Sequence, residues 1–176
     1  MNIDNCDPKY KAIIECLRDK EEKRILFVCL GNICRSPAAE GVMKSIVNEN
    51  NGKGWIIDSA GTGGWHVGEL PDKRMRIHAG RRGLVLEHRC RRVTGSDFDD
   101  FDIIIGMDSM NIDDLKQMAH SPETVGKILP MAVFIDTDYH CDHIPDPYYS
   151  GAEGFEHVLD LLENGCTNMF GLMNKD

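Results

Sequence analysis

The sequence predicts a single α/β domain in which a four-stranded parallel sheet carries helices on both faces. Short apolar segments rich in β-branched residues alternate with longer segments of helical periodicity, and this alternation is typical of parallel sheets with crossover helices. The chain has 176 residues, of which 41% are hydrophobic. That length suits one globular domain with a buried sheet.

Four segments are predicted to be buried strands, because each is short, apolar and bounded by Gly, Pro or Asp. In chain order they are residues 24–29, 55–60, 102–107 and 128–134. The longest strongly apolar run, residues 25–30, is far shorter than the roughly 20 residues that a membrane-spanning helix needs. Residues 1–23 are too polar for a secretory signal, so we expect no membrane association.

Helical patterns occupy the intervals between these strands and the C-terminus. They cover residues 37–48, 72–83, 109–119 and 152 to about 173. The last helix is the best defined, because its apolar residues recur at steps of three and four. Near the N-terminus, Asp7 is a suitable N-cap and Pro8 a suitable first helical residue. We therefore expect a helical extension over residues 1–23, ahead of a domain over residues 24–176.

The charge pattern excludes one class of partner and leaves another open. A formal net charge of −9 argues against a nucleic-acid-binding protein. Residues 73–92, however, carry eight Lys and Arg side chains against the single acid Glu87. This segment is either a solvated helix face and loop or a surface that steers an anionic, phosphorylated partner towards a cleft.

The seven cysteines are odd in number, irregularly spaced and without a C-x-x-C pair. This pattern favours reduced thiols over a disulfide framework or a zinc ribbon. We therefore expect a cytoplasmic protein, in which a cysteine of interest is one whose surroundings stabilise the thiolate.

The most informative segment joins the first predicted strand to the next helix and reads CLGNICRSP from Cys29 to Pro37. Backbone N–H groups of a tight loop before a helix can converge on a tetrahedral anion, which the positive end of the helix dipole also attracts. Gly31 and Asn32 tolerate the left-handed backbone that such a loop needs. A phosphate, or a sulfate in its place, is the expected ligand.

Cys29 and Arg35 bring complementary chemistry to this loop. The amide dipoles, the arginine and the Ser36 hydroxyl favour the thiolate of Cys29, and a thiolate is a nucleophile. Arg35 presents a planar fork that binds two phosphoryl oxygens at once. The C-x-x-x-x-x-R spacing alone is weak evidence, but the Gly-Asn turn and the Ser-Pro helix start supply the structural context that strengthens it.

Two separated motifs resemble signatures of the low-molecular-weight protein tyrosine phosphatases. VCLGNICRSPAAE is similar to the phosphate-binding loop of that family, and PDPYY at residues 145–149 is similar to its second signature. IDSAG at residues 57–61 and WHVG at residues 65–68 also fall where the family pattern has them. The resemblance extends from residue 24 to about residue 173 and implies a flavodoxin-like fold of the phosphotyrosine phosphatase I type.

The resemblance also implies roles for individual residues. Cys29 would attack phosphorus, Arg35 would bind the phosphoryl group and Asp146 would donate a proton. The remaining residues of the phosphate-binding loop would be Leu30, Gly31, Asn32, Ile33, Cys34 and Ser36. Ser59 and His88 would support Asn32 in this loop. The slot for the aromatic ring of the substrate would be lined by Trp65, Tyr148 and Tyr149, with Leu30 and Ile33.

The implied reaction is hydrolysis of phosphotyrosine, in a protein or as a small aryl phosphate, through a phosphocysteine intermediate. A positioned acid that protonates the leaving oxygen typically contributes about 10²- to 10⁴-fold in rate. Asp146 lies between two prolines, which stiffen its loop. From the sequence alone, Asp146 could equally be an aspartate of an ordinary surface turn, so its role as proton donor depends on the resemblance. No metal or other cofactor is required.

Three alternatives remain open. An arsenate reductase shares the scaffold and the loop, but Asp146 and its two neighbouring tyrosines argue against it. A phosphoarginine phosphatase is also similar, although the resemblance associates that group with threonine where this sequence has Ile33. A phosphate-binding module without turnover would have no need of Cys29, Arg35 and Asp146 together.

Two side-chain clusters carry further hypotheses. His140, Cys141 and His143 are potential metal ligands, although such crowded ligands usually face apart, so a solvated loop is favoured. Cys29 and Cys34 are close enough in a tight loop for a reversible disulfide that would protect the nucleophile. The sequence leaves open the physiological substrate, the oligomeric state and the role of residues 1–23.

Overall fold

A computed structural model of the protein describes residues 6–175. These residues contain one four-stranded parallel sheet, as predicted, in the spatial order β2-β1-β3-β4. Its strands are β1 (Lys23–Cys29), β2 (Trp55–Gly61), β3 (Ile103–Gly106) and β4 (Ile128–Pro130). The chain order reverses between β1 and β3, and in open parallel sheets such a switch point places ligands outside the carboxyl ends of the strands.

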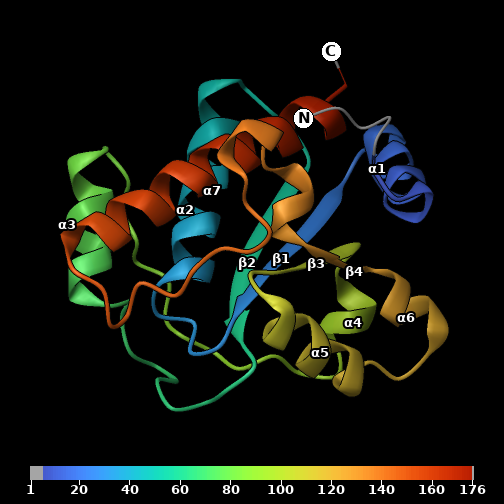
Figure 1. Ribbon diagram of the computed structural model, residues 1–176. Coiled ribbons are helices and arrows are strands. Elements are labelled where there is room, and N and C mark those ends of the chain that lie inside the picture. Colours follow the sequence, from blue (N-terminus) through green and yellow to red (C-terminus); the bar gives the residue numbers. More distant parts are fainter. Residues whose placement is uncertain (1–5, 176) are drawn as a thin grey trace.

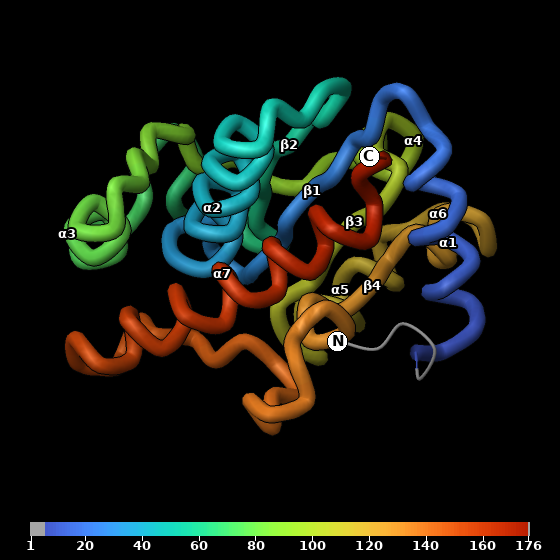
Figure 2. Tube along the Cα trace, turned by 90° about the horizontal axis from the view of Figure 1, so that it is seen from above, coloured from blue at the N-terminus to red at the C-terminus, as the bar shows by residue number. Residues whose placement is uncertain are grey.

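Helices cover both faces of this sheet, which confirms the predicted layers (Figure 1). The helices of the described residues are α1 (Pro8–Asp19), α2 (Arg35–Glu49), α3 (Lys73–Arg81), α4 (Asp97–Asp100), α5 (Ser109–Met118), α6 (Pro122–Gly126) and α7 (Ala152–Met173). Helices α2 and α7 pack side by side on one face (Figure 2). Helices α4 and α5 lie on the opposite face.

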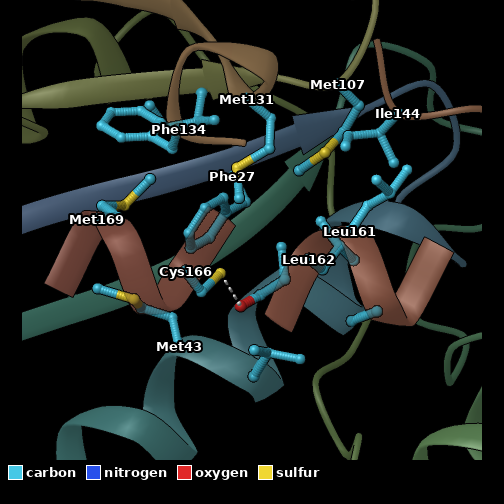
Figure 3. Packing of buried hydrophobic residues seen from close by; sticks show 14 of the residues in the cluster. Phe27, Met43, Met107, Met131, Phe134, Ile144, Leu161, Leu162, Cys166 and Met169 are labelled. Carbon is cyan, nitrogen blue, oxygen red and sulfur yellow. Dashed lines mark hydrogen bonds between the residues drawn. The ribbon is translucent and has the colours of Figure 1, made fainter. Parts of the chain in front are cut away.

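The side chains of β1 point alternately into two hydrophobic cores. Ile25 and Phe27 belong to the larger core under α2 and α7 (Figure 3), whereas Leu26 and Val28 belong to the smaller core under α5. All four are fully buried. A register shift of one residue would exchange the two sets, so this alternation also fixes the direction of Cys29 at the end of the strand.

The fourth strand is shorter than predicted. Residues 128–134 were expected to be extended, but β4 ends at Pro130 and is followed by the 3-10 helix η2 (Met131–Phe134). Pro130 has no N–H group to continue a ladder, and the i,i+3 spacing of a 3-10 turn places Met131 and Phe134 together in the core. The sequence also did not predict α4 and α6, which at four and five residues are too short to show a period.

Helix α1 packs against the larger core. As expected, Asp7 caps it, accepting a hydrogen bond from the Lys9 amide at 3.0 Å, and Pro8 is its first residue. Ile14 and Leu17 are buried with residues of α7. The first five residues of the predicted extension lie outside the described part of the chain. No helix among residues 6–175 is both long and apolar enough to cross a membrane.

Asp72 connects α3 to the loop that follows β1. Its carboxylate accepts a hydrogen bond from the Arg74 amide at 2.8 Å and so caps the helix. Its own amide donates to the Ile33 carbonyl at 2.8 Å. The cap therefore holds α3 in place beside the loop.

We predict that Asp72→Ala lowers the free energy of unfolding by about 1 kcal/mol, whereas Asp72→Asn retains most of the cap. Burial raises the pKa of Asp72, but hydrogen bonds from Arg74 outweigh it and hold the pKa below its ordinary value. A carboxyl group whose pKa is lower in the folded than in the unfolded protein stabilises the fold at pH values above its unfolded pKa. This contribution is lost as the pH falls through the folded pKa. The loss in free energy of unfolding caused by Asp72→Ala, measured with urea, should therefore be smaller at about pH 2.5 than at about pH 7. Equal losses at the two pH values would contradict this account.

Candidate active site

A pocket of about 240 Å³ opens at the carboxyl end of β1. Its lining comes from the loop after β1, the segment after β2 and the segment before α7. The lining residues are Cys29, Leu30, Gly31, Ile33, Cys34, Arg35, Trp65, His66, Asp146, Tyr148 and Tyr149. The structure thus brings most of the predicted site residues to one place, at the edge of the sheet where the strand order predicts a ligand.

The loop between β1 and α2 turns at Asn32, which has φ +56° and is fully buried. Its Nδ2 donates hydrogen bonds to Ser36 Oγ at 2.8 Å and to Ser59 Oγ at 3.0 Å. Its Oδ1 accepts from the Arg91 amide at 2.9 Å and lies 3.1 Å from His88 Nε2. Left-handed backbone is unfavourable for a residue with a side chain, so these contacts stabilise a conformation that the loop would otherwise avoid.

Further contacts surround the partners of Asn32. Ser59 donates to Glu40 at 2.6 Å, and His88 Nδ1 lies 3.4 Å from the same carboxylate. Cys90 donates its thiol hydrogen to the Asn32 carbonyl at 2.8 Å, and burial raises the pKa of Cys90 to about 11. Ser59 and His88 therefore contact Asn32 as expected, whereas sequence reasoning missed Glu40 and Cys90.

The Cys29 sulfur lies in the pocket beside a hydroxyl group. Sγ is 3.0 Å from Ser36 Oγ, and Ser36 is fully buried at the start of α2. The same hydroxyl also donates to the Ala60 carbonyl at 3.3 Å. Burial, followed by nearby acidic groups, raises the pKa of the neighbouring Cys34 thiol well above its ordinary value. Both thiols are free, so the disulfide between them stays a prediction.

Arg35 is nearly fully buried and is held from several sides. Its Nη1 donates to Asp108 Oδ2 at 2.6 Å and to the Ile144 carbonyl at 3.1 Å. Its Nη2 lies 3.5 Å from Asp146 Oδ2. Burial disfavours the charged form, but the Cys29 sulfur and the two carboxylates more than offset it and raise the pKa of Arg35. The guanidinium is therefore charged and fixed in orientation next to the sulfur.

The sequence analysis did not assign Asp108 to the site. It follows β3, so its position at the carboxyl edge of the sheet was the available signal. Its Oδ1 accepts from the Asn111 amide at 2.8 Å and caps α5, while Oδ2 binds Arg35. One carboxylate thus joins the start of a helix to the arginine.

The mouth of the pocket is aromatic and exposed. Trp65 is 71% and Tyr149 94% exposed, whereas Tyr148 is 38% exposed. The two tyrosine rings meet edge to face at 4.9 Å, and the Arg74 guanidinium lies over the Tyr148 ring. Large aromatic side chains left in solvent around a narrow opening are suited to a flat ligand.

His66 is a second residue that sequence reasoning left without a role. It lines the pocket, and a Cβ placed on Gly31 would lie 3.3 Å from its Cδ2 atom. Its Nδ1 is 2.8 Å from a Glu69 carboxylate oxygen. The only signal in the sequence was its place next to Trp65.

The candidate metal ligands predicted at residues 140–143 do not converge. In residues 6–175, His140, Cys141 and His143 are not among the groups whose ligand atoms lie within 4.8 Å of one another. Cys141 instead donates to the His143 carbonyl at 3.0 Å, and the His143 ring contacts Asp142.

Comparisons with known proteins identify relatives that match most of the chain. A family model described as "Low molecular weight phosphotyrosine protein phosphatase" matches residues 24–176, so α1 precedes the matched region. The chain is also 39% identical over 154 residues to the low molecular weight protein-tyrosine-phosphatase YfkJ of Bacillus subtilis, covering 86% of this chain and 96% of the relative.

Two solved structures are similar along most of the chain. One is a protein tyrosine phosphatase from Entamoeba histolytica with Hepes in its active site: it is 42% identical, the match covers 85% of this chain and 95% of that one, and the TM-score is 0.81. The other is a Drosophila arginine phosphatase, 34% identical over 87% of this chain and 99% of that one, also with a TM-score of 0.81. The chain therefore belongs to the low molecular weight phosphotyrosine protein phosphatase family.

Proposed function

We propose that this family member hydrolyses phosphotyrosine and small aryl phosphates through a phosphocysteine intermediate at Cys29. The observation that carries this proposal is the meeting, in one pocket, of a sulfur, a buried guanidinium and a carboxylate. Cys29 Sγ has a hydroxyl partner in Ser36, and Arg35 lies within 3.5 Å of Asp146. These are a nucleophile, an anion clamp and a proton donor.

In the first step the Cys29 thiolate attacks phosphorus and the bond from phosphorus to the phenolic oxygen breaks. Arg35 binds two equatorial oxygens as their charge is redistributed. Asp146 gives its proton to the departing oxygen, so the phenol leaves neutral. The product is a thiophosphate ester on Cys29.

In the second step a water molecule attacks the same phosphorus atom and the bond from sulfur to phosphorus breaks. Asp146, now a carboxylate, takes a proton from that water. Inorganic phosphate leaves and the thiolate is restored. All groups in the cycle come from the chain and water, so the proposal includes no metal or cofactor.

Tyrosine is favoured as the phosphorylated residue because of the exposed rings around the opening. Trp65, Tyr148 and Tyr149 line the pocket and would contact both faces of a phenyl ring. Phosphoserine is too short to pass such walls and reach Cys29. The free anions phosphate and sulfate are expected ligands of the same loop, and we propose a cytoplasmic location from the seven free thiols.

A phosphoarginine phosphatase remains the second candidate, because a Drosophila arginine phosphatase is among the similar structures. The discriminating assay compares phosphoarginine with phosphotyrosine as free amino acids under identical conditions. Faster release of phosphate from phosphotyrosine supports the present proposal, and the reverse would replace it. Arsenate reduction, assayed in parallel, tests the other activity known to share this scaffold.

We predict that Cys29→Ser abolishes hydrolysis of p-nitrophenyl phosphate, because a neutral hydroxyl is a far weaker nucleophile than a thiolate. Inorganic phosphate should still bind, since Arg35 and the loop remain. Cys141→Ser, which changes a thiol outside the pocket, is the matched control and should hydrolyse at the wild-type rate. Hydrolysis that survives in Cys29→Ser would reject the mechanism.

We expect Asp146→Asn to lower kcat about 10²- to 10⁴-fold for phenyl phosphate, whose leaving oxygen needs a proton. The loss should be smaller for p-nitrophenyl phosphate, because its leaving group is stable as an anion. The exposed Asp142, four residues earlier, provides the control Asp142→Asn. Equal losses for the two substrates would exclude Asp146 as the proton donor.

Asp108→Asn should reduce kcat/KM for aryl phosphates about 10- to 100-fold, the value of one charge-assisted hydrogen bond on Arg35. Asparagine retains the cap of α5, so thermal stability should change little. Asp113→Asn on the same helix is the control for charge. If phosphate binds more tightly to Asp108→Asn than to the wild type, Asp108 competes for Arg35 rather than positioning it.

A further inference from the structure

A second pocket, of about 350 Å³, lies beside the first. Its lining includes Leu30, Thr62, Gly63, Trp65, Arg92 and Asp114. Leu30 and Trp65 line both pockets, so these two side chains form a partition. A Cβ on Gly63 would lie 1.8 Å from the Trp65 ring, which means that the indole rests directly against the backbone there.

Strand pairing places this second pocket within reach of a residue that flanks the phosphotyrosine. Cys29 pairs with Gly61 in the sheet, and Gly61 pairs with Arg92 in an isolated parallel bridge. Neighbouring strands are about 4.8 Å apart, so the Arg92 backbone lies roughly 10 Å from that of Cys29. An extended peptide advances about 3.3 Å per residue, and its side chains add further reach.

The pocket offers hydrogen-bond donors without partners. Arg92 Nε donates to the Thr62 carbonyl at 3.1 Å, and no described residue accepts from its Nη atoms. Thr62 is only 7% exposed, yet its Oγ1 has no hydrogen-bond partner in the described part of the chain. The Thr62 hydroxyl is enclosed by the fold, so the donors open to a ligand carboxylate are the Nη atoms of Arg92.

Asp114 lies on the same pocket but forms no ion pair with Arg92 in residues 6–175. It contributes a carboxylate, against the guanidinium of Arg92. It should therefore weaken binding of an acidic ligand without abolishing it, and its removal should have the opposite effect to removal of Arg92.

Arg92 differs from three other arginines of residues 73–92 in its electrostatic partners. Arg74, Arg82 and Arg91 are paired with carboxylates of the protein itself. Their charges are thus largely neutralised by local partners. Arg92 combines a guanidinium free of such partners with a place beside the substrate slot.

We propose that this second pocket is a peptide subsite that selects phosphotyrosine substrates with an acidic residue next to the phosphotyrosine. The ligand carboxylate binds the guanidinium of Arg92, while the peptide backbone passes over the Trp65 partition. This inference rests on the proposed function, since it adds a recognition site for the flanking sequence of the same substrate.

The test measures kcat/KM for phosphotyrosine peptides that carry a single Glu or Gln at one of the two positions before or after the phosphotyrosine. p-Nitrophenyl phosphate, which has no flanking residues, is the reference substrate. In the wild type, Glu should be preferred to Gln by about two- to fivefold at one of these positions, the effect of one partly exposed ion pair. Arg92→Gln should remove this preference and leave hydrolysis of p-nitrophenyl phosphate unchanged.

Two further variants sharpen the test. Arg81→Gln removes the charge of an exposed arginine at the end of α3 and should retain the preference. Asp114→Asn should increase it, and this prediction does not depend on whether Arg92→Gln folds. Equal kcat/KM for Glu and Gln peptides in the wild type, a preference for Gln, or equal losses on peptides and p-nitrophenyl phosphate in Arg92→Gln would each overturn the proposal.

Failure of the underlying function would look different. The wild type would then hydrolyse neither the peptides nor p-nitrophenyl phosphate, and both proposals would fall. Hydrolysis that requires Cys29 but ignores the flanking residue rejects the subsite alone.

Discussion

The geometry of the site depends on one buried amide side chain, that of Asn32. Its positive φ turns the loop back on itself, and its hydrogen bonds to Ser36, Ser59 and the Arg91 amide fix that turn to three different parts of the chain. An unpaired amide in this interior position would be costly. Because every contact is made within the fold, the loop is formed before any substrate arrives, and preorganised groups stabilise a transition state without rearranging.

The charges in the site are set by nearby residues and not by the negative net charge of the whole protein. A buried guanidinium is tolerable only when it is paired and hydrogen-bonded, and Arg35 meets this condition through Asp108 and the Ile144 carbonyl. The remaining edge of Arg35 faces the pocket beside Cys29 and Asp146. A protein with a net charge of −9 can therefore offer an anion site, because only nearby and poorly screened charges act strongly on a buried ligand.

The sheet explains why these groups meet. The alternation along β1 buries Phe27 and Val28 in opposite cores and leaves Cys29 at the carboxyl end, where β3 ends one strand away. Asp108, in the segment that follows β3, therefore reaches Arg35 although the two residues are 73 positions apart. The segment carrying Asp146 arrives at the same edge because it leads into α7, which packs along α2.

The sequence by itself determined the fold class, the extent of α7, the cap of α1 and the loop from Cys29 to Ser36. These features depend on contacts between residues that are close in the chain, or on periodic patterns of apolar residues that can be read directly from the sequence. Ser59, His88, Asp146 and the aromatic residues were reached only through the family resemblance.

Only the tertiary structure decided the pairing of Arg35 with Asp108, the place of His66 and the pocket around Arg92. Each of these depends on contacts between side chains of segments that are distant in the sequence. The spacing of residues along the chain does not indicate such contacts. A local pattern can therefore predict the nucleophile and its loop, whereas the groups that orient them become visible only when the strands are in register.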